Sequence, residues 1–102
     1  MSKITLSNDE LEEMCADFKA LSDPGRMKII LFLLDGEKSV GEISSVVDMG
    51  QSATSHQLRI LKDYRVVKNR KQGNTVFYRI ADEHVKTIIE MSLSHLNCVG
   101  EE

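Results

Sequence analysis

Four side chains of the types that bind transition metals lie near the end of the chain. They are Asp82, His84, His95 and Cys98. Carboxylate oxygen, imidazole nitrogen and thiolate sulfur are ligands from which proteins build zinc sites. If this segment is helical, His95 and Cys98 lie three residues apart on one face and can chelate the same ion. The chemistry that these residues predict is metal binding.

The two pairs of candidate ligands cannot meet within one helix. At a rise of about 1.5 Å per residue, roughly 16 Å separates His84 from His95. At about 100° per residue, however, one stripe of the helix within roughly 80° holds His84, Ile88, Met91, His95 and Cys98. If the helix packs antiparallel against its own copy, Asp82 and His84 of one chain face the other pair, and symmetry creates two equivalent sites. Such a ligand set suits zinc, with cobalt, nickel or cadmium as alternatives.

An ordinary structural role for these residues stays open at this point. The two histidines could be polar residues of a helix interface, and Cys98 could be a small buried hydrophobe. Cys98 also lies near the chain end, where a helix can fray, and water or Glu101 could then complete the metal shell.

A second group of side chains suited to recognition covers residues 51–59, which are rich in Gln and Ser. In the major groove of DNA, Gln bonds adenine, Arg bonds guanine, and Ser or Thr bonds bases or phosphates. Such a polar face also occurs on ordinary surface helices, and His56 could cap or pack against a neighbouring helix instead. The candidate DNA-binding residues here are Gln51, Ser52, Thr54, Ser55, His56, Gln57 and Arg59.

Positive charge is concentrated in the same part of the chain. The 102 residues carry 13 Lys and Arg against 16 Asp and Glu, a net charge of −3. Residues 51–80, however, hold seven basic side chains and one acidic one, a net charge of +6, and the remainder carries −9. Because electrostatic fields in salt act locally, this basic segment can attract a polyanion. Its candidate contacts to a DNA backbone are Lys68, Arg70, Lys71 and Gln72.

The elements that position these residues follow from caps, periodicity and turns. Ser7 with Glu10 and Ser39 with Glu42 form capping boxes, and Asp23 precedes a proline at a helix start. Two runs with β-strand character flank Gly73-Asn74, which is typical of a hairpin turn. The expected helices cover about 8–20, 24–36, 39–47 and 51–64 and run from Asp82 to about 97; the expected strands cover 65–70 and 75–80.

The two helices 39–47 and 51–64, joined by a tight turn at 48–50, have the layout of a helix-turn-helix. A basic hairpin follows directly, so the chain is predicted to be a winged helix-turn-helix of order α-α-α-α-β-β-α. This fold class is mainly α with a small β-hairpin; the second helix enters the major groove and the hairpin lies along the backbone. We expect one such DNA-binding domain over residues 1–102, dimeric through its first and last helices.

Helical spacing also predicts which side chains are buried. Val46 is expected inward on the helix 39–47, and Ala53, Leu58 and Leu61 inward on the helix 51–64. Cys15 lies on the apolar stripe of the first helix, so a buried structural role is expected for it. In the hairpin, Val76 and Tyr78 share a strand face that is expected to join the core.

Length and composition exclude several classes of protein. The longest apolar run, Ile29–Leu34, is far shorter than the ~18–20 residues of a membrane span, and the amino terminus lacks the apolar core of a signal peptide. Two cysteines 83 positions apart form no disulfide framework, which favours a reducing, cytoplasmic location. No arrangement typical of catalytic side chains stands out, so neither an enzyme nor a small organic substrate is expected.

From about Phe18 to Cys98 the sequence resembles the ArsR/SmtB family of bacterial metal-sensing winged-helix repressors. The resemblance rests on segments 20–26, 51–58 and 73–78 and on the last-helix pattern Asp-x-His-x10-His-x2-His/Glu. The chain matches this pattern at Asp82, His84 and His95, and Cys98 stands in the variable fourth place. The resemblance implies a homodimer that binds double-stranded operator DNA without metal and releases it when zinc or a similar metal binds.

Two further observations refine this expectation. A second metal site of the family uses a Cys-Val-Cys segment, but this chain has Ser39, Val40 and Gly41 there, which argues against a thiolate site at that place. The alternative function is a thiol- or redox-responsive winged-helix repressor that uses Cys15 and Cys98.

Overall fold

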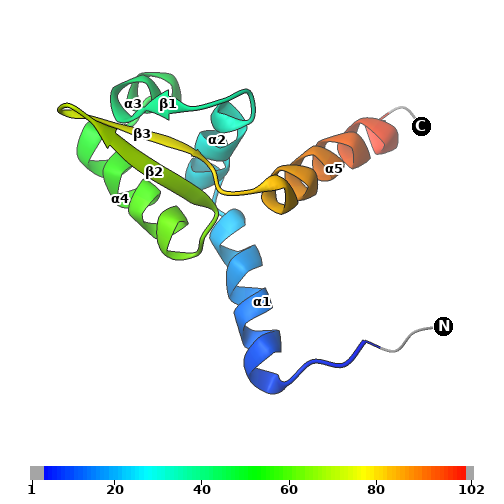
Figure 1. Cartoon of the computed structure of the whole chain (residues 1–102). Helices are drawn as coiled ribbons and strands as arrows, with labels where there is room; N and C mark the ends of the chain where they lie inside the picture. The colour runs from blue at the N-terminus through cyan, green and yellow to red at the C-terminus, as the bar shows by residue number, and fades with distance from the viewer. Residues whose placement is uncertain (1–3, 101–102) are drawn as a thin grey trace.

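The computed structural model describes residues 4–100, with side chains placed for residues 4–97. The predicted winged helix-turn-helix is confirmed, with one further short strand (Figure 1). The elements are α1 (Asn8–Leu21), α2 (Pro24–Leu33), β1 (Lys38–Ser39), α3 (Val40–Val47), α4 (Gln51–Asp63), β2 (Val67–Gln72), β3 (Thr75–Ile80) and α5 (Glu83–Gly100).

Three helices begin where their caps predict. The Ser7 hydroxyl accepts a hydrogen bond from the Glu10 backbone N–H, and the Glu10 carboxylate accepts one from Ser7 N–H. Ser39 and Glu42 repeat this capping box at α3, and the Asp23 carboxylate caps α2. Because each cap satisfies backbone donors that the first turn leaves unpaired, these short-range signals determine where the helices start.

The hairpin pairs β2 with β3 antiparallel around a two-residue turn. Gly73 occupies this turn with a φ of +62°, a conformation that glycine adopts without steric cost. The outer strand β1 pairs with β3, which gives the sheet order β1-β3-β2. The sequence did not predict β1, because two residues are too short to show a period-two pattern.

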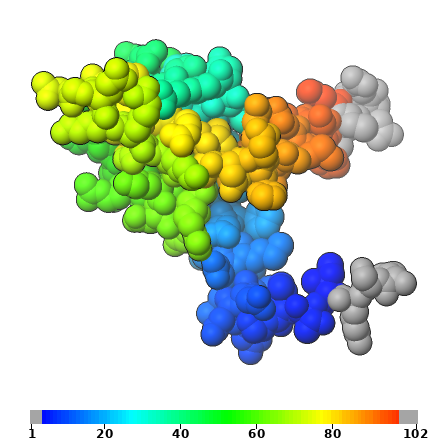
Figure 2. All heavy atoms as spheres, in the orientation of Figure 1, coloured from blue at the N-terminus to red at the C-terminus, as the bar shows by residue number. Residues whose placement is uncertain are grey.

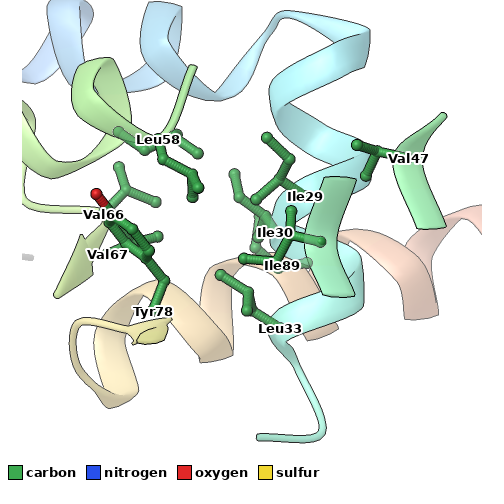
Figure 3. Close-up of a cluster of buried hydrophobic side chains, with 11 residues drawn as sticks. Ile29, Ile30, Leu33, Val47, Leu58, Val66, Val67, Tyr78 and Ile89 are labelled. Atoms are coloured by element: carbon green, nitrogen blue, oxygen red, sulfur yellow. The ribbon is translucent and has the colours of Figure 1, made fainter. Parts of the chain in front are cut away.

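A single hydrophobic cluster holds α2, α3, α4 and the hairpin together (Figure 3). Ile29, Ile30 and Leu33 of α2 are fully buried at its centre. Leu58 and Leu61 pack against them from α4, so the polar side of α4 faces outward. Tyr78 and the half-buried Val76 join from β3, as expected. The other buried members are Ile43, Val47, Val66, Val67 and Ile89.

The first and last helices project from this body (Figures 1 and 2). α1 packs on it chiefly through α2, and α5 packs through Val85 and Ile89 near its start. The radius of gyration is 15.4 Å, larger than the ~13 Å of a compact chain of this length. Both helices therefore leave much of their length uncovered in the single chain.

Four burial predictions were wrong. Ala53 is exposed, and Thr54 is fully buried, because the stripe that faces the core is Thr54, Leu58 and Leu61 at i, i+4 and i+7. Val46 is 58% exposed, since the short α3 turns only Ile43 and Val47 into the core. Cys15 is exposed because it lies on the uncovered side of α1.

Candidate nucleic-acid interface and candidate metal site

Side-chain hydrogen bonds stabilise the turn between α3 and α4 and so the angle between these two helices. Asp48 ends α3 in the left-handed conformation, with φ 55°. The Ser44 hydroxyl donates to the Met49 carbonyl at 2.8 Å, and the Thr54 hydroxyl donates to the Gly50 carbonyl at 3.0 Å. Because Thr54 is fully buried and bonded inside the turn, it does not lie on the outward face that the sequence had predicted for it.

The exposed face of α4 gathers five of the seven DNA contacts that were predicted on this helix. Gln51, Ser52, Ser55, His56 and Arg59 line one shallow depression. A second depression lies between the starts of α3 and α4 and the hairpin turn. The residues that line it include Ser39, Gly41, Gln51, Ser55, Asn74 and Thr75. The two depressions share Gln51 and Ser55, so they form one surface from the helix to the wing.

Gln57 differs from its neighbours on α4. It is half-buried, and its side-chain oxygen accepts a hydrogen bond from the Arg26 guanidinium at 3.2 Å. Arg26 also donates to the Ala20 carbonyl at 2.8 Å. Sequence reasoning missed this contact because 31 positions separate the two side chains.

The wing carries its basic residues in two different settings. Lys68 and Lys71 are exposed. Arg70 instead forms two hydrogen bonds with the Glu37 carboxylate, at 2.9 and 2.6 Å, and a third with Gln72. Its guanidinium also lies 4.7 Å from the centre of the Phe77 ring. The hydrogen bond from Arg70 lowers the pKa of Glu37, so an intramolecular acid already neutralises part of this predicted phosphate contact.

Asp82 and His84 lie together at the start of α5. The Asp82 carboxylate accepts a hydrogen bond from the Val85 backbone N–H, which lowers the pKa of Asp82. Its Oδ1 atom is 3.6 Å from His84 Nδ1, and both side chains are exposed. A carboxylate oxygen and an imidazole nitrogen at this separation fit two neighbouring positions on one metal ion.

The rest of the predicted ligand stripe lies farther along α5. His95 is exposed, as are Ile88 (41%) and Met91 (65%) between the two histidines. The side chain of Cys98 lies outside the described residues. Among the described side chains, no three His, Cys, Asp or Glu residues lie close enough to hold a metal ion. In a single chain, the described candidate ligands at the two ends of α5 are therefore too far apart to bind one ion, and the helix face between them is exposed.

The described helices include none that is long and apolar enough to cross a membrane. The family model for "Bacterial regulatory protein, arsR family" matches residues 23–69, which run from the cap of α2 into β2. The matched segment contains the whole helix-turn-helix and the first three residues of β2.

Individual relatives extend the match beyond that segment. The chain is 37% identical over 91 residues to a transcriptional repressor SmtB homolog of Synechocystis, covering 89% of this chain and 69% of that protein. It is also 37% identical to the cadmium resistance transcriptional regulatory protein CadC homolog of Staphylococcus aureus, over 92% of this chain and 78% of that protein.

A solved structure agrees with the fold. It is the homodimeric winged helix-turn-helix DNA-binding domain of Mb0332 from Mycobacterium bovis, which superposes with a TM-score of 0.82 at 26% identity. The match covers 93% of this chain and 91% of that one, so it includes α1 and α5 as well as the body.

Proposed function

The chain belongs to the arsR family of bacterial regulatory proteins, and we propose that it is a metal-responsive transcriptional repressor. Proteins of this family are DNA-binding transcription regulators and not enzymes. It binds double-stranded operator DNA as a homodimer and releases it when zinc or a similar transition metal binds across paired α5 helices. Its place of action is the cytoplasm, where bacterial operators lie.

The DNA-binding part of this proposal rests on the continuous surface of α4 and the wing. Gln51, Ser52, Ser55 and Arg59 are exposed on α4 and suit contacts to bases and phosphates. Lys68 and Lys71 supply exposed charge on the wing for the backbone. His56 lies on the same exposed face, so its contact with DNA is part of the proposal.

The metal-sensing part rests on the uncovered stripe of α5. Asp82 and His84 form a half-site at one end, and His95 lies at the other. Antiparallel pairing of two α5 helices covers the exposed Ile88 and Met91 and places each half-site against the distal ligands of the second copy. Cys98 is the proposed fourth ligand. Nitrogen, oxygen and sulfur ligands of this kind suit zinc, with cobalt, nickel and cadmium as alternatives.

The two parts are coupled through the dimer. Two recognition helices must lie about one turn of DNA apart, roughly 34 Å, to enter successive major grooves. Ligands that close across the α5 pair favour the dimer arrangement in which they meet best. If that arrangement spaces the two α4 helices differently, metal binding lowers the affinity for DNA, and DNA binding lowers the affinity for metal by the same factor.

Fluorescence anisotropy of the dimer on DNA selected from a random pool in the presence of EDTA tests the proposal. Zinc should weaken binding by about 5- to 150-fold, and EDTA should restore it. His84→Gln and His95→Gln should bind DNA like the unmodified chain but lose the zinc effect. Glu90→Gln, an exposed charge on the same helix, should keep the effect.

Two outcomes would contradict the proposal in different ways. Unchanged DNA affinity with zinc, cobalt, nickel and cadmium would exclude metal sensing while leaving DNA binding intact. Loss of dimerisation in both histidine variants would show instead that these residues are polar parts of the interface.

A second candidate function is a thiol-responsive repressor that uses Cys15 and Cys98. The exposed position of Cys15 favours it, since an accessible thiolate can be oxidised. Under this alternative, hydrogen peroxide changes DNA affinity, dithiothreitol reverses the change, and His84→Gln does not affect it. Cys15→Ser abolishes the response.

A further inference from the structure

Arg26 occupies the junction of three helices, on the first turn of α2. Its Nε donates to the Ala20 carbonyl of α1 at 2.8 Å, and its Nη1 donates to the Gln57 side chain of α4 at 3.2 Å. A third, longer contact of 3.5 Å reaches the Lys19 carbonyl. One half-buried guanidinium therefore connects the last turn of α1 to the middle of the recognition helix.

The physical setting makes this connection a strong one. The last carbonyls of a helix lack intrahelical partners and carry partial negative charge. A guanidinium at this end supplies both the missing hydrogen-bond donors and a compensating positive charge. The planar fork of an arginine can hold acceptors on two elements at a fixed angle, which a lysine ammonium cannot.

A second contact between α1 and the end of α4 is much weaker. Arg65, just after α4, bonds Glu13 of α1 at 3.0 Å, but the two side chains are 83% and 61% exposed. Exposed ion pairs of this kind contribute little to stability, because water and salt screen the two charges. The half-buried Arg26 is thus the better candidate for holding α1 and α4 in a fixed relation.

We propose that Arg26 is a positioning residue that fixes the orientation of α4 relative to α1, with Gln57 as its partner and not a base-reading residue. Its effect on DNA affinity rests on the proposed function. The Gln57 oxygen that accepts from Arg26 is the same atom that would bond adenine in a two-bond contact. Because α1 belongs to the proposed dimer interface, its angle to α4 sets the spacing of the two recognition helices.

Arg26→Lys provides the first test, because it keeps the positive charge and removes the planar guanidinium that contacts two helices. Positioning predicts that DNA affinity falls about 3- to 30-fold while the slope of log affinity against log salt stays unchanged, since no phosphate contact is lost. Lys28→Arg, an exposed control on the same helix, should leave affinity unchanged. Full affinity in Arg26→Lys, or a slope reduced by about one in Arg26→Gln, would overturn the proposal.

A double-mutant cycle with Gln57→Leu provides the second test. If the two side chains act as one contact, each single substitution weakens DNA binding similarly and the double substitution weakens it no further. Thermal unfolding of each variant shows whether the body remains folded. Additive losses would mean that Gln57 contacts DNA independently, and they would overturn the assignment.

A third measurement needs no DNA and separates this proposal from the proposed function. Spin labels at Asp17→Cys on α1 and Ser52→Cys on α4, in a chain whose two cysteines are replaced by serine, report the distance between the helices. Labelled chains are diluted with unlabelled ones so that only distances within a chain contribute. A distance distribution that broadens or shifts with Arg26→Lys supports positioning, and an unchanged one overturns it, whether or not the chain binds DNA.

Discussion

The body of the molecule and its two terminal helices differ sharply in how they bury apolar surface. Ile30 and Leu58 in the body are fully buried. On the terminal helices, large apolar side chains of the same type remain uncovered. The exposed fractions are Leu11 51%, Met14 50% and Phe18 50% on α1, and Ile88 41%, Met91 65% and Leu96 67% on α5.

Two sets of contacts therefore organise one chain. Contacts within the chain suffice for the body, because each of its elements buries an apolar side against the others. Contiguous exposed apolar surface is typical of protein interfaces. Under the proposed function, the terminal helices complete their packing in the dimer, so the region that reads DNA and the region that senses metal can be disrupted separately.

Substitutions in the body should cause the greatest loss of stability. Ile30→Ala should lower the free energy of unfolding by about 2–5 kcal/mol, because it leaves a cavity in a fully packed site. Leu31→Ala, at the neighbouring position with 39% exposure, should cost less than about 1 kcal/mol. Urea unfolding at one protein concentration measures both. Equal losses would show that the body is not the independently packed region.

Met91→Glu should disrupt the terminal region and leave the body folded. A charge on the proposed interface dissociates the dimer, and DNA affinity then falls by about 100-fold or more because the two recognition helices no longer bind together. Sedimentation equilibrium and anisotropy measure the two effects, and circular dichroism checks the fold. Met91→Leu, which conserves volume, should remain dimeric. A dimeric Met91→Glu would place the interface elsewhere.

A smaller effect distinguishes two basic residues of the wing. Lys71→Gln should reduce the slope of log affinity against log salt by about one, as expected for one lost phosphate contact. Arg70→Gln should reduce it less, because Glu37 already pairs with Arg70. Salt titrations of both variants under the same conditions provide the comparison. A larger change for Arg70 would mean that it exchanges Glu37 for phosphate when DNA binds.

The smallest effect is a pH dependence of the wing. The pKa of Glu37 is lowered from 4.5 by the hydrogen bond from Arg70, so the ionised form is favoured in the folded state. The stabilisation is therefore present above about pH 4.5 and is lost as pH falls through the lower folded pKa. Glu37→Gln should have a flatter acid unfolding curve than the unmodified chain. Parallel curves between pH 2 and 5 would contradict this role of Glu37.

Features that depend on short-range signals could be predicted from the amino-acid sequence alone. The caps Ser7, Asp23 and Ser39 place three helix starts, and the Gly73 turn places the hairpin. The helical spacing also predicts that His84 and His95 lie on one face of α5, and both side chains are exposed. These signals act within one helical turn or one hairpin, so the tertiary structure does not change them.

The packing of the helices and strands determines which polar side chains are exposed to a ligand and which form contacts within the fold. The Thr54 hydroxyl donates hydrogen bonds to two backbone carbonyls of the turn and is buried there, whereas the neighbouring Ala53 is exposed. Gln57 bonds Arg26 across 31 positions, and Arg70 bonds Glu37 across 33. Such pairs depend on how helices and strands pack against one another, and packing joins positions whose sequence distance carries no signal. The same reason applies to Cys15, which lies on an apolar stripe that the single chain leaves uncovered.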